Sequence, residues 1–234
     1  MDTRTRILHA AADLLARSTE ADVSTRAVCE AAGVGAPVLY RQFGDKEGLL
    51  SAVVDFGFEQ YLAAKRAAKP SGDPLRDLRD GWDNHTAFAL ENPNFYRLMY
   101  SPGLSTPPAA AAEAHRMLLA VLERCAAAGR LRISPELAAR MVMPANTGVA
   151  LLLITRPAIY TDAREISTRV REAVLTAIIA PDGPGGAREP DREIAVRAAS
   201  LGALLRALPQ SPLSAAETAL LLEWLTRLAN HPTT

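Results

Sequence analysis

Apolar residues recur at three- and four-residue intervals along this chain, and this spacing constrains its fold more than any other feature of the sequence. Ile7, Ala11, Leu14 and Leu15 form one such stripe near the start of the chain. No stretch alternates apolar and polar residues in the manner of a half-buried β-strand. Alanine is the commonest residue and aromatic residues make up only 5%, which favours helices over sheets. The sequence therefore predicts an all-α fold.

Length and composition narrow the class of protein further. A chain of 234 residues has room for two modest domains. Lys plus Arg and Asp plus Glu both number 26, so only a local basic patch could attract a nucleic acid. Two cysteines are too few for a disulfide framework, and the N-terminus lacks an apolar signal core. The uncharged run 141–154 has 14 residues, short of the ~20 that span a bilayer. We therefore expect a cytoplasmic protein with no membrane segment.

The first 48 residues break into three short helices that precede a long one. Ser24 is a suitable cap for a helix over 25–32, and glycines at 33 and 35 then turn the chain. Pro37 suits the first turn of a helix over 36–43, and Asp45 suits the cap of a helix that continues to residue 66. Two short helices joined by a glycine turn and braced by a third are typical of a helix-turn-helix, whose second helix enters the major groove of DNA.

Three short motifs in this region carry a family resemblance. Ala-Ala-Gly-Val at 31–34, Leu-Tyr-x-x-Phe at 39–43 and Lys-Glu-x-Leu-Leu at 46–50 stand at the spacing of TetR-family repressors. Residues 5–55 thus resemble the DNA-binding domain of that family. The resemblance implies an N-terminal three-helix helix-turn-helix DNA-binding domain at 1–48 and a C-terminal helical ligand-binding and dimerisation domain. It also implies double-stranded operator DNA and a small-molecule effector as partners, and a homodimer.

The same resemblance implies contacts with the DNA backbone. Tyr40 stands where the family places a tyrosine against a phosphate, and Lys46 matches a phosphate-binding lysine. Thr25 should offer its hydroxyl and a free backbone N–H to another phosphate, helped by the helix dipole.

Base recognition is implied for the third helix. Arg41 is the best candidate, because arginine pairs bidentately with guanine in the major groove. Ala36, Pro37 and Val38 stand where polar readers are usual and offer only apolar contact, for instance with thymine methyl groups. Residues 1–48 hold six basic groups against seven acidic ones, so attraction must come from basic groups on one side, among them Arg26.

The rest of the chain is expected to divide into a ligand-binding and dimerisation domain at 49–180, a Gly/Pro-rich linker at 181–190 and a two-helix extension at 191–234. A helix without charge around the run 141–154 must be covered on more than one side. By resemblance we therefore place the dimer interface on 134–155 and 163–180.

Polar residues on apolar helical stripes mark a candidate effector pocket. His85 lies on a stripe with Trp82, His115 on a stripe with Leu118, and Asn146 on a stripe within the uncharged run. No lysine or arginine lies on these stripes, which favours a neutral or weakly polar, partly aromatic ligand. The alternative is that each is a satisfied polar group of the core. The predicted lining residues are Trp82, His85, Phe88, Tyr96, Met99, His115, Met143 and Asn146.

The extension is expected to pack its apolar stripes on the core or on a partner subunit, because leaving them in water would expose an unusually large patch. One stripe consists of Ile194, Ala198, Leu201, Leu205 and Leu208, and the other of Leu221, Trp224, Leu225 and Leu228.

Two hypotheses follow from the sequence. The first is a TetR-like transcriptional regulator, a repressor released from its operator by a small, mostly apolar ligand. The second is a helical small-molecule-binding or interaction module that has lost its affinity for DNA, as the apolar third helix and the charge balance of residues 1–48 would allow. No nucleotide-binding, hydrolase or metal-ligand motif is present, so neither hypothesis includes an enzyme, a metal or a cofactor.

Overall fold

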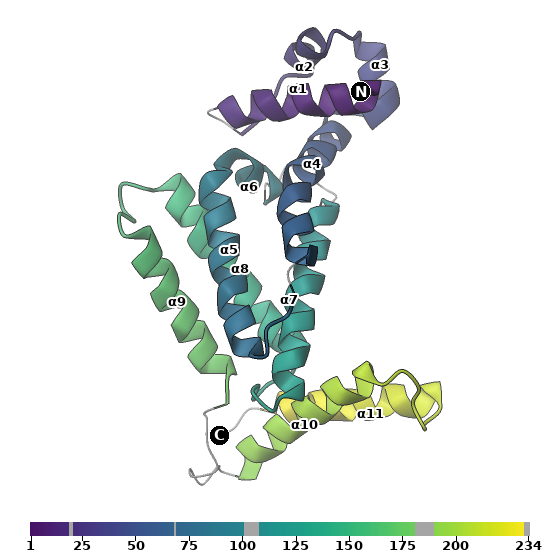
Figure 1. Ribbon diagram of the computed structural model, residues 1–234, viewed down its shortest axis with the longest axis vertical. Coiled ribbons are helices and arrows are strands. Elements are labelled where there is room, and N and C mark those ends of the chain that lie inside the picture. Colours follow the sequence, from purple (N-terminus) through teal and green to yellow (C-terminus); the bar gives the residue numbers. More distant parts are fainter. Residues whose placement is uncertain (19–20, 68, 101–107, 181–189, 232–234) are drawn as a thin grey trace. The chain divides into compact units, whose positions relative to one another are not determined.

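The computed structural model describes residues 1–18, 21–67, 69–100, 108–180 and 190–231. Among these residues there are eleven helices and no strand, which confirms the all-α prediction (Figure 1). The helices are α1 (Thr3–Arg17), α2 (Thr25–Ala32), α3 (Ala36–Phe43), α4 (Lys46–Ala67), α5 (Pro74–Glu91), α6 (Pro93–Met99), α7 (Ala109–Ala127), α8 (Pro135–Thr155), α9 (Ala163–Ile178), α10 (Pro190–Ala207) and α11 (Ala215–Ala229).

The chain forms two compact units. The first unit consists of 1–69, 85–114 and 150–160, and the second of 70–84, 115–149 and 161–234. The limits between the units fall inside α5, α7 and α8, so each of these helices contributes to both. The linker predicted at 181–190 lies outside the described residues up to position 189, and the predicted domain limits stay predictions.

The helix-turn-helix in the first unit has the predicted helices, 25–32 and 36–43. Gly33 ends α2 in the left-handed region at φ 62°, where its N–H is donated to the carbonyls of Cys29 and Glu30. Val28 of α2 and Leu39 of α3 are fully buried, as are Ile7 and Leu15 of α1. Helix α2 packs its apolar side on α1, and α3 packs on α2 and α4. Both short helices leave their other sides to solvent.

The start of α4 is fixed by a cap and by a close approach of the backbone. The Asp45 carboxylate accepts a hydrogen bond from the N–H of Gly48 at 2.7 Å. A Cβ on Gly48 would lie 2.1 Å from the carbonyl oxygen of Phe43, so only glycine fits there. The end of α3 and the first turn of α4 are held together in this way.

Helices α4 and α6 lie unusually close together in the first unit. A Cβ on Gly57 would lie 2.3 Å from Cδ1 of Phe95, so the ring rests directly on the α4 backbone. Asn94 of α6 also donates hydrogen bonds to the carbonyls of Leu15 (2.9 Å) and Ser18 (2.7 Å) at the end of α1. Helix α6 thus joins α1 to α4.

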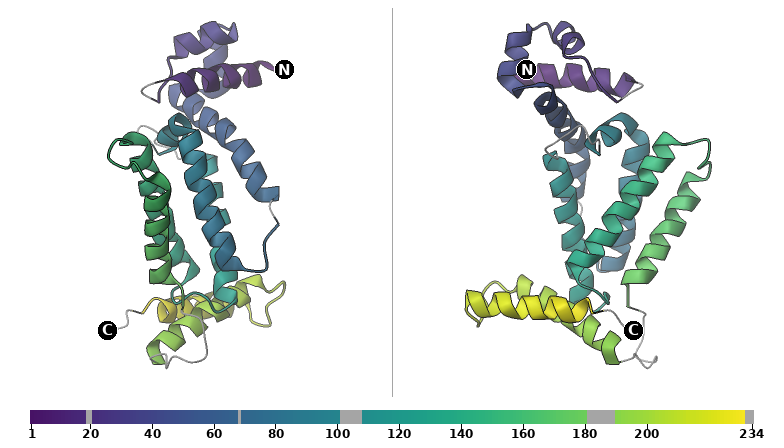
Figure 2. Two further views of the ribbon diagram at one scale, coloured as in Figure 1. Left: turned by 60° about the vertical axis from the view of Figure 1, so that its left-hand side comes forward. Right: turned by 180° about the vertical axis from the view of Figure 1, so that it is seen from behind.

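The second unit has its own core, built around Leu122, Leu131, Leu175 and Ile178, all with at most 2% of their surface exposed. Helices α10 and α11 lie side by side and both contribute to this core (Figure 2). Asn230, at the end of α11, exchanges hydrogen bonds with Ser134, its side-chain oxygen accepting from the Ser134 N–H at 2.9 Å. The extension therefore packs on the core, one of the two positions expected for it.

The stripes predicted for that packing are wrong in part. Helix α10 buries alanines, including Ala198 and Ala203, whereas Leu201 and Leu208 are 46% and 47% exposed. On α11, Leu225 is buried but Trp224 is 52% exposed. Leu205 and Leu221 also pack partly against the core. Small side chains let α10 approach its neighbours closely, and the remaining large residues of the predicted stripes lie on the outside.

In the part of the chain that the structure describes, α8 is the one helix long and apolar enough to cross a membrane by length and composition. Its Ala138, Ala139 and Val142 are buried in the core of the second unit. Core helices commonly meet the same two criteria.

We predict that Gly57→Ala lowers the free energy of unfolding by about 1–3 kcal/mol, because its methyl group would overlap the Phe95 ring. Gly81→Ala on α5 is the matched control. No atom lies within 4 Å of a Cβ there, so we expect a gain of about 0.5–1 kcal/mol from helix propensity. Urea unfolding of both variants tests this, and equal effects of the two substitutions would contradict the close packing of α4 on α6.

Candidate functional site

The outer side of α3 is an exposed surface formed by the residues predicted to read DNA. Ala36, Pro37, Tyr40 and Arg41 are exposed, Val38 is half-buried, and only Leu39 points into the core. Arg41 makes no hydrogen bond or ion pair with any residue that the structure describes. Its guanidinium is therefore available to an external partner.

Three other arginines of this region, Arg4, Arg6 and Arg26, are engaged. Arg26 pairs with Glu30 across one turn of α2 at 3.0 Å, both side chains being exposed. Arg4 donates to the carbonyl of Gln42 at 2.8 Å and lies over the Phe43 ring, and Arg6 donates to the carbonyl of Ala32 at 3.0 Å. Arg4 and Arg6 thus brace α1 against the ends of α3 and α2.

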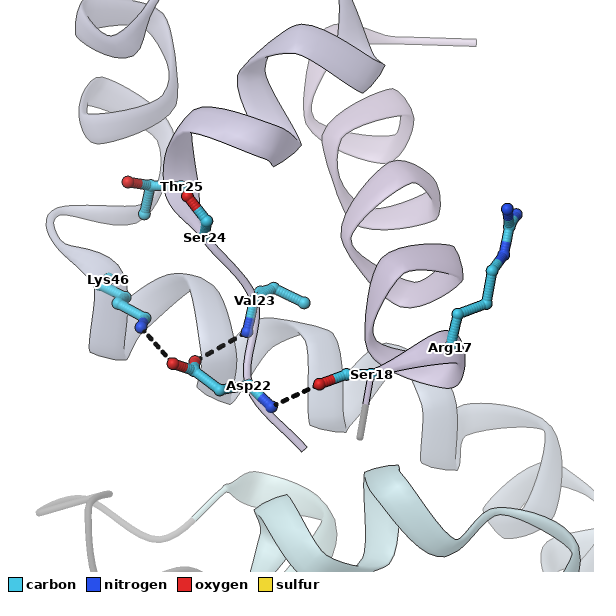
Figure 3. A pocket seen from close by; sticks show the side chains of 7 residues that line it. All are labelled: Arg17, Ser18, Asp22, Val23, Ser24, Thr25 and Lys46. Carbon is cyan, nitrogen blue, oxygen red and sulfur yellow. Dashed lines mark hydrogen bonds and ion pairs between the residues drawn. The ribbon is translucent and has the colours of Figure 1, made fainter. Parts of the chain in front are cut away.

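An open pocket lies at the N-terminus of α2 (Figure 3). Ser24 occupies the N-cap position but its side chain makes no capping hydrogen bond, which leaves first-turn amides of α2 without that acceptor. Lys46 approaches from the start of α4, and Arg17 points away from it (Figure 3). The lining residues are Arg17, Ser18, Asp22, Val23, Ser24, Thr25 and Lys46.

Asp22 organises this pocket. Its carboxylate accepts from the Lys46 ammonium at 2.6 Å and from the Val23 N–H at 2.7 Å (Figure 3). Partial burial opposes the charged form of Asp22, but these two hydrogen bonds and the Lys46 charge outweigh it and lower the pKa of the carboxyl. Sequence reasoning missed Asp22, because nothing in the chain signals a partner 24 residues away.

A cluster of aromatic and polar side chains lies inside the first unit. Nε2 of His85 and the Tyr96 hydroxyl are 2.7 Å apart and both side chains are buried. The Tyr61 ring lies 4.5 Å from that of Phe88 and 6.4 Å from that of His85, measured between centroids. Its buried hydroxyl has no hydrogen-bond partner among the described residues. We call Tyr61, His85, Phe88 and Tyr96 the aromatic cluster.

Burial changes the ionisation of groups at the aromatic cluster. It lowers the pKa of His85 to about 3, with a smaller contribution from the charge of Lys65, so the imidazole is neutral at pH 7. It also lowers the pKa of Lys65 to about 8. The Lys65 ammonium lies 4.7 Å from the centroid of the Tyr61 ring. A cation therefore stands beside this cluster, which the sequence stripes did not indicate.

The structure divides the predicted effector-binding residues between the two units. His85, Phe88, Tyr96 and the buried Met99 belong to the first unit. Trp82, Met143 and Asn146 belong to the second, where Trp82 donates its indole N–H to Ser167 at 2.9 Å and Asn146 donates to the Trp82 carbonyl at 3.2 Å. Trp82 and Asn146 thus hold α5, α8 and α9 together, as polar groups of a core do.

The prediction that His115 faces inward is wrong. Its side chain is exposed on α7, while Cys125, further along the same helix, is buried. The apolar surface of this alanine-rich helix is wide, and the periodicity did not settle which edge of it points inward. Among the described residues there is no group of three His, Cys, Asp or Glu side chains that could hold a metal ion.

An exposed second helix in a helix-turn-helix, beside an uncapped helix N-terminus, is the arrangement of proteins that bind double-stranded DNA. Residues 7–53 match the family described as bacterial regulatory proteins, tetR family. Residues 78–228 match the tetracyclin repressor-like C-terminal domain. The chain belongs to the TetR family of DNA-binding transcriptional regulators, as its sequence motifs predicted.

Individual relatives agree with this assignment. The HTH-type transcriptional regulatory protein RaaS of Mycobacterium tuberculosis is 48% identical over 52 residues, which are 22% of this chain and 24% of RaaS. The chain thus matches about a quarter of the length of that curated relative.

Among solved structures, FadR from Bacillus subtilis, in complex with stearoyl-CoA, is similar with a TM-score of 0.62 and 16% identity, over 74% of this chain and 98% of FadR. NalD of Pseudomonas aeruginosa, the secondary repressor of a multidrug efflux pump, gives a TM-score of 0.55 and 21% identity, over 77% of this chain and 98% of NalD. These two likenesses concern the fold alone.

We predict that the stability of this protein falls as the pH drops from about 6.5 to 5. The unfolded chain binds a proton at His85 in this range, whereas the folded chain, with a pKa of about 3 there, does not. Below the pKa that His85 has in the unfolded chain, its contribution to the change in the free energy of unfolding approaches ~1.4 kcal/mol per pH unit. Urea unfolding at a series of pH values should show a flatter profile for His85→Gln than for the wild type.

The control for this measurement is His115→Gln, at an exposed position, which should leave the slope as it is in the wild type. An unchanged slope in His85→Gln would mean that the imidazole is not held in its neutral form.

Proposed function

We propose that this TetR-family regulator is a dimeric repressor that a small, mostly apolar ligand releases from its operator, and that it acts in the cytoplasm without a metal or cofactor. The observation that carries the proposal is the exposed outer side of α3, where Arg41 has no partner among the described residues, next to the open N-terminus of α2.

Three side chains are suited to phosphate binding. Thr25 lies in the first turn of α2, where amide groups and the helix dipole favour an anion. Lys46 is placed beside it by Asp22, and the Tyr40 hydroxyl is exposed on α3. Contacts of this kind set the position of a protein on the duplex but carry no sequence information.

Base recognition falls mainly to Arg41. A guanidinium donates two hydrogen bonds to O6 and N7 of guanine, and an unpartnered side chain has no internal ion pair to break first. Ala36, Pro37 and Val38 add apolar surface suited to thymine methyl groups. Arg26 is exposed on α2, where it adds positive charge although it is shared with Glu30.

Tight binding requires a two-fold dimer, because a helix-turn-helix dimer presents two recognition helices to two half-sites. We place its interface on α8 and α9. Leu152 of α8 is 41% exposed, and the uncharged run 141–154 needs cover on its free sides.

We place the effector at the aromatic cluster, together with Met99. The Tyr61 hydroxyl lacks a partner among the described residues and could bind a polar group of a ligand, and the rings offer stacking surface. Trp82, Met143 and Asn146, which belong to the second unit, are not part of the effector site proposed here. This revises the lining expected from the sequence.

Helix α4 connects effector and DNA. Lys46 and Tyr61 lie on this one helix, about 22 Å apart along its axis. A ligand that binds more tightly to an arrangement unable to hold DNA would shift the protein towards it, with a typical coupling of ~1–3 kcal/mol.

For DNA binding we predict that Arg41→Ala costs about 1–3 kcal/mol on the operator and relaxes the preference at one base pair. Lys46→Ala should weaken binding to all sequences alike, because it removes a phosphate contact. Mobility shifts with DNA from upstream of the gene and with random DNA measure both effects.

The matched control is Arg76→Ala, an exposed arginine on α5 that pairs only with Asp80. This substitution should change neither the affinity for operator DNA nor the affinity for random DNA. If Arg41→Ala weakens random DNA as much as operator DNA, Arg41 contacts a phosphate and does not read a base. If the wild type shifts neither DNA, the protein is a ligand-binding or interaction module without DNA affinity.

For the effector we predict that ligands found by thermal shift are neutral or weakly polar and release operator DNA in a competition assay. Tyr61→Phe and His85→Ala should weaken their binding, whereas Lys65→Met should leave it nearly unchanged. His115→Ala, at an exposed position, is the control. Anionic ligands whose binding depends on Lys65 would overturn the proposed ligand class.

A further inference from the structure

Large apolar side chains are exposed mainly on α10, α11 and the turn between them. Of thirteen such side chains with substantial exposure among the described residues, eight lie between 194 and 228, each 38–52% exposed. They are Ile194, Leu201, Leu204, Leu208, Leu213, Leu220, Trp224 and Leu228. We call these eight residues the outer stripe. Its concentration on one hairpin separates it from the scattered apolar residues of an ordinary surface.

The outer stripe has the spacing of a helix-packing seam. From Ile194 to Leu208 its members follow one another at steps of seven, three and four residues, and from Leu213 onward the steps are seven, four and four. The other side of each helix is already buried in the core of the second unit, at Ala198 and Ala203 on α10 and at Leu225 on α11. A helix that is apolar on two sides is normally covered on both.

The charges beside the outer stripe cancel. Residues 190–230 contain four basic and four acidic residues and no lysine. Arg197 pairs with Glu193 and Arg227 with Glu223, each across one turn of its own helix. A surface that binds an identical surface needs equal numbers of positive and negative charges, because two copies with the same net charge would repel each other. An anionic membrane would instead select an excess of Lys and Arg.

The size of the outer stripe suits a protein interface. With each of its residues about half exposed, it presents on the order of 600 Å² of apolar surface, against the roughly 800 Å² that each partner contributes to an interface of standard size. A shallow groove beside it, lined by Val196, Leu201, Leu204 and Gly129 among others, offers a place for a bulky side chain.

We propose that the outer stripe of α10 and α11 is an interface with a second copy of this chain, with Trp224 as its main anchor. Tryptophan is enriched among the residues that dominate binding energy, and Trp224 is the most exposed member of the stripe. This contact is separate from the one proposed on α8 and α9, and it does not depend on whether the protein binds DNA.

The test is the self-association of the full chain, measured by sedimentation over a range of concentrations. Leu204→Glu with Trp224→Glu should raise the dissociation constant at least about thirty-fold, the effect of losing one dominant contact. Trp224→Ala, which adds no charge, should also raise the dissociation constant. The matched control is Ala207→Glu with Ala219→Glu, at two exposed positions on the same helices outside the stripe. This control should change the dissociation constant less than about threefold.

Tryptophan fluorescence gives a second readout on the unmodified protein. Trp82 is buried, so quenching by acrylamide reports chiefly on Trp224 and should increase when dilution separates the copies. Unchanged association in the double variant, or equal quenching of associated and separated chains, would overturn the proposal. If Leu152→Glu separates the copies while the stripe variants do not, the α8 and α9 interface stands and the stripe belongs to another partner or a membrane. A wild type that stays monomeric would overturn both.

Discussion

The contact of the Phe95 ring with the α4 backbone at Gly57 determines how the first unit can work. It leaves no room for a side chain, so α4 and α6 cannot separate slightly without losing their packing altogether. Asn94 ties the same short helix to the end of α1. The DNA-reading helices and the aromatic cluster are therefore attached to one stiff element. For the proposed regulation, we therefore expect a change in the packing around Tyr61 to reach Lys46 as a movement of the whole of α4.

The sequence indicated the helices well, because their signals are local. Ser24, Pro37 and Asp45 each act within one turn of the helix that they start, and the structure has helix starts at all three places. The capping box of α11 is complete, with the Ser214 and Glu217 side chains each bonded to the other's backbone. The three motifs of the helix-turn-helix were informative for the same reason, since their spacing is set by two short helices and one turn.

Features that depend on distant residues could not be predicted in this way. The Lys46–Asp22 pair joins α4 to the segment before α2, the His85–Tyr96 pair joins α5 to α6, and no periodicity indicates either pair. Residues at helical spacing showed that α10 is apolar, but not that Ala198 and Ala203 would be inside while Leu201 and Leu204 lie outside. Burial of the larger residue is the better guess for a chain folding alone. Its failure at these positions is the observation from which the interface of the outer stripe is proposed.

The ion pair between Lys46 and Asp22 has a consequence for how ionic strength acts on this regulator. A free lysine that meets a phosphate displaces a condensed cation from the duplex, and each such event steepens the fall of affinity with salt. Lys46 already has an internal counter-ion in Asp22, and the aspartate must be displaced or brought near the phosphate when DNA arrives. The favourable release of a cation is then offset by exposure of a carboxylate. On the proposed phosphate contact, we therefore expect Lys46 to add less than a full charge to the salt dependence of DNA binding, because its ammonium exchanges one anionic partner for another.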